Sequence, residues 1–369
     1  MNKTLWSVRQ FRNLGLFRRL GLFASLGLLV LLMPALSNAK PLMYVPRGET
    51  NDLLIIDLKS DKIVGRIDEL ENAHGLASNS KTEYLVAGSM QTASGATSSK
   101  AAKPAAVSEA EHEAHHAGGA KKPTADGPSF VSIVHARHGH VMNRINVRGL
   151  THHTAVSPDG KTAIAVHSGA GGISVIDLDR MEVTKTLQTG LWPNYAVFAE
   201  KRARLYVSNA KPGTVTEIDT KSWTIRREMK VGKEPEHIVL SKDNNVLYTS
   251  NKGDGSVSAL DLNTGKVRKQ YTVGKKAHGL DLSDDGRWLF SASKGANTLT
   301  RIDLSSDKST TINLKPAPYH LAYIPGMNKL YVSSRKLPKI WIIDPETLKM
   351  VGEIDLGKGV AHQMVIRNN

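Results

Sequence analysis

The chain of 369 residues contains no cysteine. This absence excludes disulfides, thiolate metal sites, iron–sulfur clusters, covalently attached c-type haem and a cysteine nucleophile. Aromatic residues make up only 5% of the chain, so the core must consist mainly of Val, Ile, Leu and Ala. A nucleophile elbow, an HExxH motif and a phosphate-binding loop are also missing. Among residues with distinctive chemistry, 14 histidines remain.

Residues 1–39 have the pattern of a secretory signal peptide. Five basic residues and no acid lie within residues 1–19, and the apolar run LGLFASLGLLVLLMPAL extends from Leu20 to Leu36. Ser37 and Ala39 then provide small residues at the −3 and −1 positions of a cleavage site. We expect a bacterial protein that is periplasmic or secreted. An uncleaved anchor is the alternative, and Arg18-Arg19 leaves Sec and twin-arginine export open.

The rest of the chain repeats with a period of 42 residues. Equivalent segments end in aspartate at steps of 42, 42, 42 and 41 residues, at Asp177, Asp219, Asp261, Asp303 and Asp344. One period before Asp177 lies His135, and the previous equivalent residue, Asp57, is a further 78 residues back, which is one period plus 36 residues. The sequence therefore predicts seven units, one of which holds an insertion.

Each unit has the pattern of four short strands. The unit that begins near Lys275 contains AHGLDLS, RWLFSAS, NTLTRIDL and KSTTINL, separated by clusters of turn-forming residues. The mature chain opens with the last three strands of a unit and ends with VAHQMVIR, the first strand of one. An open superhelix would leave both strand edges uncapped. We therefore predict that residues 40–369 form an all-β, seven-bladed β-propeller with four-stranded blades, whose terminal blade is closed by the C-terminal strand.

The segments PDGKTAIAVH, ARLYVSNAKPGTVTEID and NVLYTSNKGDGSVSALDLNTGKV resemble the YVTN family of propeller repeats. The resemblance covers essentially all of residues 42–369 and implies the propeller fold. Similar blades occur in the haem d1-binding propeller of nitrite reductases, in the copper-binding propeller of nitrous oxide reductases and in lactonases. The resemblance therefore leaves the function open.

Histidine recurs where the first strand of each unit begins. The aligned first position is occupied by His74, His152, Asn194, Glu236, His278, Tyr319 and His362. The next position holds Gly75, His153, Tyr195, His237, Gly279, His320 and Gln363. Since the first strand of a blade lines the central channel and imidazole suits copper, zinc and haem iron, we predict that a copper, zinc or haem-type metal centre is held by His74, His152, His153, His237, His278, His320 and His362.

Two considerations limit this prediction. Neighbouring strand positions point to opposite faces, so the two sets of histidines are expected to face different ways, and a single seven-histidine cluster is not expected. Alternatively, the histidines belong to the repeat architecture and bond the recurring aspartates, which otherwise cap turns between strands.

The surplus of 36 residues coincides with a low-complexity, histidine-rich segment at residues 91–128. Its composition predicts a loop inserted within one blade. His112 and His116 are four residues apart and would share one face of a helical turn. Together with His115 they are candidate ligands for Zn²⁺, Cu²⁺ or Ni²⁺. His135, His138 and His140 follow shortly after the loop.

The positive charge suggests a second class of function. The formal charge of +15 falls to +10 when the five basic residues of residues 1–39 are removed. A protein partner or an anionic surface bound through a basic face is the alternative to metal binding, in a protein we expect to be monomeric. Sparse aromatics disfavour nucleic acid. A lactonase-like hydrolase is the third reading, but Glu236 and Asn194 alone name no catalytic residue. The basic clusters are Lys201-Arg202-Ala203-Arg204, Arg226-Arg227, Lys266–Lys269 and Lys275-Lys276.

Overall fold

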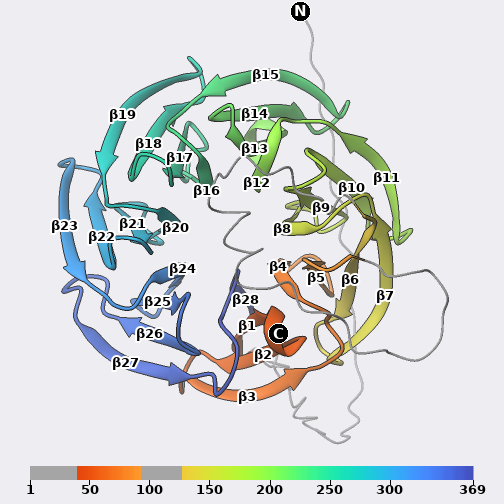
Figure 1. Ribbon diagram of the computed structural model, residues 1–369, viewed down its shortest axis with the longest axis horizontal. Helices are drawn as coiled ribbons and strands as arrows, with labels where there is room; N and C mark the ends of the chain where they lie inside the picture. The colour runs from red at the N-terminus through yellow and green to blue at the C-terminus, as the bar shows by residue number, and fades with distance from the viewer. Residues whose placement is uncertain (1–39, 93–126, 369) are drawn as a thin grey trace, which may run out of the picture. The chain divides into compact units, whose positions relative to one another are not determined.

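Seven four-stranded antiparallel sheets surround a central channel (Figure 1). The computed structural model describes residues 40–92 and 127–368. The predicted signal peptide and the candidate ligands His112, His115 and His116 lie outside the described residues. Within the described ranges, no helix is long and apolar enough to cross a membrane. The predicted seven-bladed propeller is confirmed.

The blades are numbered here in chain order, and the strands of each are given from the channel outward. Blade 1 contains β28 (Val365–Asn368), β1 (Pro41–Arg47), β2 (Asp52–Asp57) and β3 (Lys62–Ile67). Blade 2 contains β4 (Ala73–Ala77), β5 (Tyr84–Ser89), β6 (Ser129–His135) and β7 (His140–Val147). Blade 3 contains β8 (Thr151–Val156), β9 (Thr162–His167), β10 (Ile173–Asp177) and β11 (Glu182–Leu187). Blade 4 contains β12 (Leu191–Ala199), β13 (Arg204–Lys211), β14 (Thr214–Asp219) and β15 (Thr224–Lys230).

The remaining three blades follow the same plan. Blade 5 contains β16 (Pro235–Leu240), β17 (Val246–Asn251), β18 (Ser256–Asp261) and β19 (Lys266–Thr272). Blade 6 contains β20 (Ala277–Leu282), β21 (Trp288–Ser293), β22 (Thr298–Asp303) and β23 (Lys308–Asn313). Blade 7 contains β24 (Pro318–Ile324), β25 (Lys329–Ser334), β26 (Lys339–Ile343) and β27 (Met350–Asp355). Two short 3-10 helices, η1 (Gly48–Thr50) and η2 (Glu200–Arg202), complete the regular structure of the described residues.

The C-terminal strand closes the ring. β28 pairs antiparallel with β1, from Pro41 opposite Asn368 to Tyr44 opposite Val365. This pairing covers an edge of β1 that would otherwise expose unpaired backbone groups. The closure also joins blade 1 to blade 7, since Met43 and Tyr331 pack in one apolar cluster.

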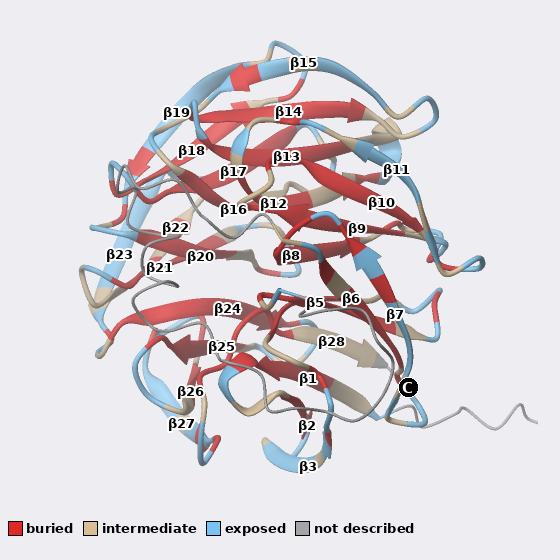
Figure 2. Cartoon of the chain, turned by 45° about the vertical axis from the view of Figure 1, so that its right-hand side comes forward, coloured by how far each residue is buried: buried red, intermediate tan, exposed pale blue. Residues whose placement is uncertain are grey.

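The hydrophobic core lies between the blades. Each of the seven clusters of buried apolar residues combines side chains from two neighbouring blades, so the core is distributed around the ring. The outermost strands, such as β19 and β23, are largely exposed, whereas the inner strands are buried (Figure 2). Because the blades pack through these inner strands, the polar residues that face the channel are held by a rigid frame.

The recurring aspartates cap turns. Asp57 Oδ1 accepts hydrogen bonds from the backbone N–H groups of Lys59 and Ser60, at 2.9 and 3.0 Å. The same pair of bonds recurs at Asp177, Asp219, Asp261, Asp303 and Asp344. The turn-capping role is therefore confirmed, and pairing of these aspartates with the channel histidines is wrong.

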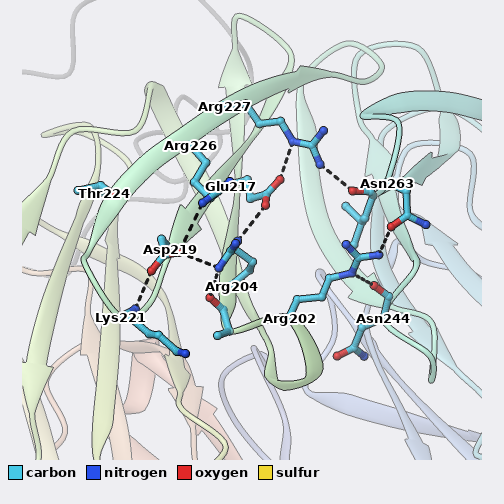
Figure 3. Close-up of polar contacts among 12 residues, drawn as sticks. Arg202, Arg204, Glu217, Asp219, Lys221, Thr224, Arg226, Arg227, Asn244 and Asn263 are labelled. Atoms are coloured by element: carbon cyan, nitrogen blue, oxygen red, sulfur yellow. Dashed lines mark hydrogen bonds and ion pairs between the residues drawn. The ribbon is translucent and has the colours of Figure 1, made fainter.

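Two of the predicted basic clusters take part in contacts between blades 4 and 5 (Figure 3). Arg204 pairs with Glu217 at 3.1 Å and with Asp219 at 2.8 Å. Arg227 pairs with the other oxygen of Glu217 at 2.6 Å and donates to the carbonyl of Leu262. Arg202 donates to Asn263 of blade 5. Arg204 and Arg227 are thus partly neutralised by carboxylates of their own blade, whereas Arg202 and Arg227 link blade 4 to blade 5.

A buried histidine outside the channel cluster gives the fold a measurable sensitivity to acid. Burial and, to a smaller degree, the charge of Arg148 lower the pKa of His167 from 6.5 to about 4. The imidazole is therefore neutral in the folded protein, and its contribution to stability is present above pH 6.5 and lost as the pH falls toward 4. Between pH 7 and pH 4, we expect the free energy of unfolding of wild type to fall by about 3 kcal/mol more than that of His167→Gln.

Urea unfolding at both pH values measures this difference. The change in unfolding free energy between the two pH values is compared within each protein. It is therefore independent of the stability that the variant loses at pH 7 with the bond from His167 to Ser174. Equal acid destabilisation in the two proteins would contradict the prediction.

Candidate metal centre

The innermost strands are bulged where the histidines lie. In blades 2 to 7 the pairing of the first strand with the second shifts register at this point, between the residue that precedes the histidine positions and a residue two or three places later. A bulge inserts an extra residue and redirects the side chains beside it. Two consecutive side chains therefore reach the channel, as at His152 and His153, and the expectation that the two sets face different ways is wrong.

All seven histidines predicted from the sequence form one cluster. Each is at most 5% exposed. Ring-centroid distances link them from blade to blade, for example 4.0 Å between His74 and His362, and 4.5 Å between His74 and His152. The chain of contacts continues through His153–His237, His237–His320 and His278–His320, at 5.0, 4.7 and 5.0 Å.

Three of these histidines lie close enough together that they could hold one metal ion. His153 on β8, His237 on β16 and His320 on β24 offer ring nitrogens that all lie within 4.8 Å of one another. They come from blades 3, 5 and 7, so alternate blades of the ring supply them. No two of these residues are neighbours in sequence. Their nitrogens converge because the blades are arranged in a closed ring.

The tautomer of His153 is fixed by its backbone contact. Its Nδ1 lies 2.7 Å from the carbonyl oxygen of Asn194. Because a carbonyl only accepts, Nδ1 carries the hydrogen and Nε2 keeps a lone pair, as is usual for a metal-binding imidazole. Among the described residues, Nε2 of His153 and both ring nitrogens of His320 have no hydrogen-bond partner. These orphaned nitrogens are the donors a metal ion would need.

Burial keeps these rings neutral. It lowers the pKa of both His153 and His320 well below 6.5, and the neighbouring histidines lower it further. Burial likewise lowers the pKa of His278 to about 4, although Glu236 lies 3.3 Å from its Nδ1. The neutral imidazole is the metal-ligating form, so at neutral pH these rings are in the protonation state that a metal ion would require.

A cavity of about 170 Å³ lies beside the histidines. It is lined by His237 and His320 together with Asp281, Tyr195 and Gln363. Asp281 accepts backbone hydrogen bonds from Leu282 and Tyr323, both at 2.8 Å. Burial raises the pKa of Asp281 to about 6. An acid with this pKa exchanges its proton near neutral pH, which suits a general base or acid.

Asp281 is not among the residues predicted from the sequence, although the repeat contains a signal for it. The equivalent position of the other six units holds only Ala or Val, at Ala77, Ala155, Val197, Val239, Ala322 and Val365. A single acid at an otherwise apolar channel position departs from the repeat architecture. Asp281 lies outside the two aligned histidine positions, three residues after His278.

The other histidine-rich segment lies away from the channel. Strand β6 ends at His135, and strand β7, its hairpin partner, begins at His140. The ring centroids of His135 and His138 are 4.3 Å apart. Nε2 of His135 is 3.6 Å from Glu83, and its Nδ1 accepts a bond from the backbone of His138. His135 thus caps its turn as the aspartates do in other blades.

Gly279 allows blades 6 and 7 to approach each other at the level of the triad. A Cβ atom at this position would lie 2.1 Å from the carbonyl oxygen of Tyr319 and 3.2 Å from Cα of His320. Because backbone atoms cannot move aside cheaply, we expect Gly279→Ala to cost about 1–3 kcal/mol of stability, measured by urea unfolding. Gly352→Ala is the control, since its nearest atom is the tip of the Ile342 side chain at 3.3 Å. Equal effects of the two substitutions would refute this account.

Fold and site together define a seven-bladed propeller with a polar, histidine-lined channel. Residues 71–309 match the family model described as "Lactonase, 7-bladed beta-propeller". The match covers more than half of the chain, which therefore belongs to this family of seven-bladed lactonase-type propellers. The narrower resemblance to YVTN repeats stays a prediction. A comparison with curated protein sequences finds no match.

Solved structures share the fold at low sequence identity. Hydrazine synthase of Kuenenia stuttgartiensis is 14% identical, with a TM-score of 0.63 over 82% of this chain and 91% of that one. Dihydro-heme d1 dehydrogenase NirN in complex with DHE is 14% identical, with a TM-score of 0.62 over 87% of this chain and 65% of that one. A functionally unknown protein from Desulfotomaculum acetoxidans is 12% identical, with a TM-score of 0.67 over 88% and 98%. At these identities the likeness shows the fold alone.

Proposed function

We propose that this propeller binds a transition metal ion in its channel through His153, His237 and His320. The convergence of their ring nitrogens within 4.8 Å carries the proposal. Imidazole ligands without thiolates favour zinc, copper or nickel. The predicted export of the chain would place the site in the periplasm or outside the cell.

The site needs only a small contraction to take an ion. Zinc binds imidazole nitrogen at about 2.0–2.1 Å, so three tetrahedral ligands lie roughly 3.3 Å apart. The ring nitrogens, which lie within 4.8 Å of one another, would have to approach by up to about 1.5 Å to reach this separation. The cavity lined by His237 and His320 leaves room for a fourth ligand, such as water. An open fourth position is typical of catalytic rather than structural zinc.

The dimensions of the channel favour an ion over a haem-type centre. Seven imidazole rings fill this level of the channel, with neighbouring centroids 4.0–5.0 Å apart along the chain of contacts. The cavity beside them measures about 170 Å³, whereas pockets for drug-sized organic ligands usually measure roughly 300–1,000 Å³. A tetrapyrrole does not fit this space.

Metal analysis of the untagged protein tests the proposal. The histidine-rich segment must be removed in parallel, because it would bind metal on its own. A Cβ on Gly127 would lie 3.2 Å from Thr92 Cγ2, so residues 93–126 can be deleted and the two ends joined. We expect at least one tightly held zinc, copper or nickel ion in the full chain and one in the chain that lacks residues 93–126. Loss of the metal with residues 93–126 would contradict a channel site.

Lactone hydrolysis is a second candidate function. It is supported by the family match and by the cavity that Asp281 and Tyr195 share with two triad histidines. Asp281 would act as the general base toward water beside the bound lactone. A panel of γ- and δ-lactones assayed by pH-stat measures turnover. Absence of turnover with all of them, with and without added Zn²⁺, would end this candidate and leave metal binding untouched.

A further inference from the structure

Three cations occupy equivalent positions in consecutive blades. Lys252, Lys294 and Arg335 each follow directly after the second strand of blades 5, 6 and 7. The backbone N–H of each donates to the carbonyl of the residue just before the innermost strand of its own blade: Glu234, Lys276 and Ala317, at 2.9, 3.2 and 2.8 Å. All three therefore lie at the end of the channel where the innermost strands begin.

These cations are buried. Lys252 is 9% exposed, and Lys294 and Arg335 are each 7% exposed. A buried cation is costly unless a partner balances it. Lys252 has two, since its Nζ lies 3.2 Å from Glu234 and 3.5 Å from Glu236.

Arg335 has no such balance. Among the described residues no carboxylate pairs with it, and its Nε has no hydrogen-bond partner. Its guanidinium lies 5.7 Å from the centroid of the Tyr319 ring. Lys294 approaches the same ring, with Nζ 5.2 Å from the centroid. One aromatic ring thus brings two buried cations together.

The cations adjoin the histidine cluster. Tyr319 stacks on His278 with ring centroids 4.2 Å apart. Burial lowers the pKa of His362 well below 6.5, and the charges of Arg335 and Lys294 lower it further. Their positive field therefore reaches the mouth of the channel.

The repeat architecture does not explain this cluster. The same position holds Met90 in blade 2 and Ala210 in blade 4, so the fold does not require a cation there. Exposed lysines lie in the connections that flank the inner strands of blades 5 to 7, and such a surface concentrates anions. They are Lys233, Lys275, Lys276, Lys315 and Lys336.

We propose that the channel mouth at blades 5 to 7 binds the oxyanion group, carboxylate or phosphate, of a small molecule. Arg335 presents a planar fork of donors that matches such a group, and Lys294 adds a second charge. The site lies beside the histidines, so a ligand held there extends toward the triad. The inference does not depend on the metal.

Calorimetry on the full chain, treated with EDTA and dialysed into 0.15 M NaCl, tests the site. Inorganic phosphate and succinate are the two probes, and the one that binds more tightly identifies the group. We expect a dissociation constant below about 1 mM for that probe. Arg335→Gln and Lys294→Gln should each weaken binding at least about tenfold. Arg335→Lys keeps the charge without the fork and should give an intermediate loss.

Lys336→Gln is the matched control, because it removes an exposed charge next to Arg335. It should change binding less than about twofold if a built site rather than a diffuse field holds the anion. Thermal melting of each variant checks folding. Failure of both probes to bind, or equal weakening by Lys336→Gln and Arg335→Gln, overturns the proposal.

Discussion

Replacing His320 with glutamine is expected to lower the affinity of the channel for Zn²⁺ or Co²⁺ at least about 100-fold. His320 contributes a ring whose two nitrogens lack partners among the described residues, and it is 1% exposed. Glutamine preserves much of the volume but offers only an amide, a poor ligand for these ions. The background should lack residues 93–126, so that the channel alone is measured.

Cobalt provides a direct readout. A tetrahedral Co²⁺ centre has intense d–d absorption that disappears when a ligand is lost. His152→Gln is the matched control, since His152 is equally buried, directly precedes His153 and lies outside the triad. It should retain the absorption. If both substitutions abolish binding to the same degree, the triad is not the ligand set, and the histidines act as packing residues.

Replacing Asp281 with asparagine is expected to reduce lactone hydrolysis at least about 100-fold, the usual contribution of a general base. The activity of wild type should rise with pH through about 6, where the carboxyl group loses its proton. Asp284→Asn is the control, because Asp284 lies on the same blade and is exposed. A wild-type profile flat between pH 5 and 8, or an active Asp281→Asn, would remove Asp281 from the chemistry.

The same substitution should leave the fold intact. Burial raises the pKa of Asp281 to about 6. The folded protein therefore loses stability as the pH rises toward 6, and it stays less stable above that pH because the carboxylate is buried. Asparagine carries no charge and removes this destabilisation. Asparagine also accepts only one of the two backbone hydrogen bonds that Asp281 receives. These effects oppose each other, so a melting temperature within a few degrees of wild type is expected at pH 7.5. A large loss of stability would make the activity result uninterpretable as catalysis.

The fold and the candidate ligands could be predicted because the repeat is regular. The nearly constant spacing from Asp177 to Asp344, extended back to His135 and Asp57, indicated the number of units, and each capping aspartate marks the same turn. The alignment then placed all seven histidines at one level, and the ring contacts confirm that level. Periodicity carries this information because each blade buries its apolar side chains against its two neighbours in the same way.

The direction of the side chains could not be predicted. Strict alternation along a strand would have separated His152 from His153, yet the two rings lie 4.3 Å apart in one cluster. The register shift between Thr151 and His153 causes this, and a bulge leaves no reliable mark in a single sequence.

The amino-acid sequence by itself therefore determined the number of blades, the closure by the C-terminal strand and the level of the histidines. Tertiary structure alone decided which side chains meet. His153, His237 and His320 are 84 and 83 residues apart, and ring closure and bulges bring their nitrogens within 4.8 Å. Likewise, burial beside other blades raises the pKa of Asp281, and burial leaves the charge of Arg335 without a carboxylate partner among the described residues. Such properties depend on desolvation and distance, which folding creates and sequence spacing does not encode.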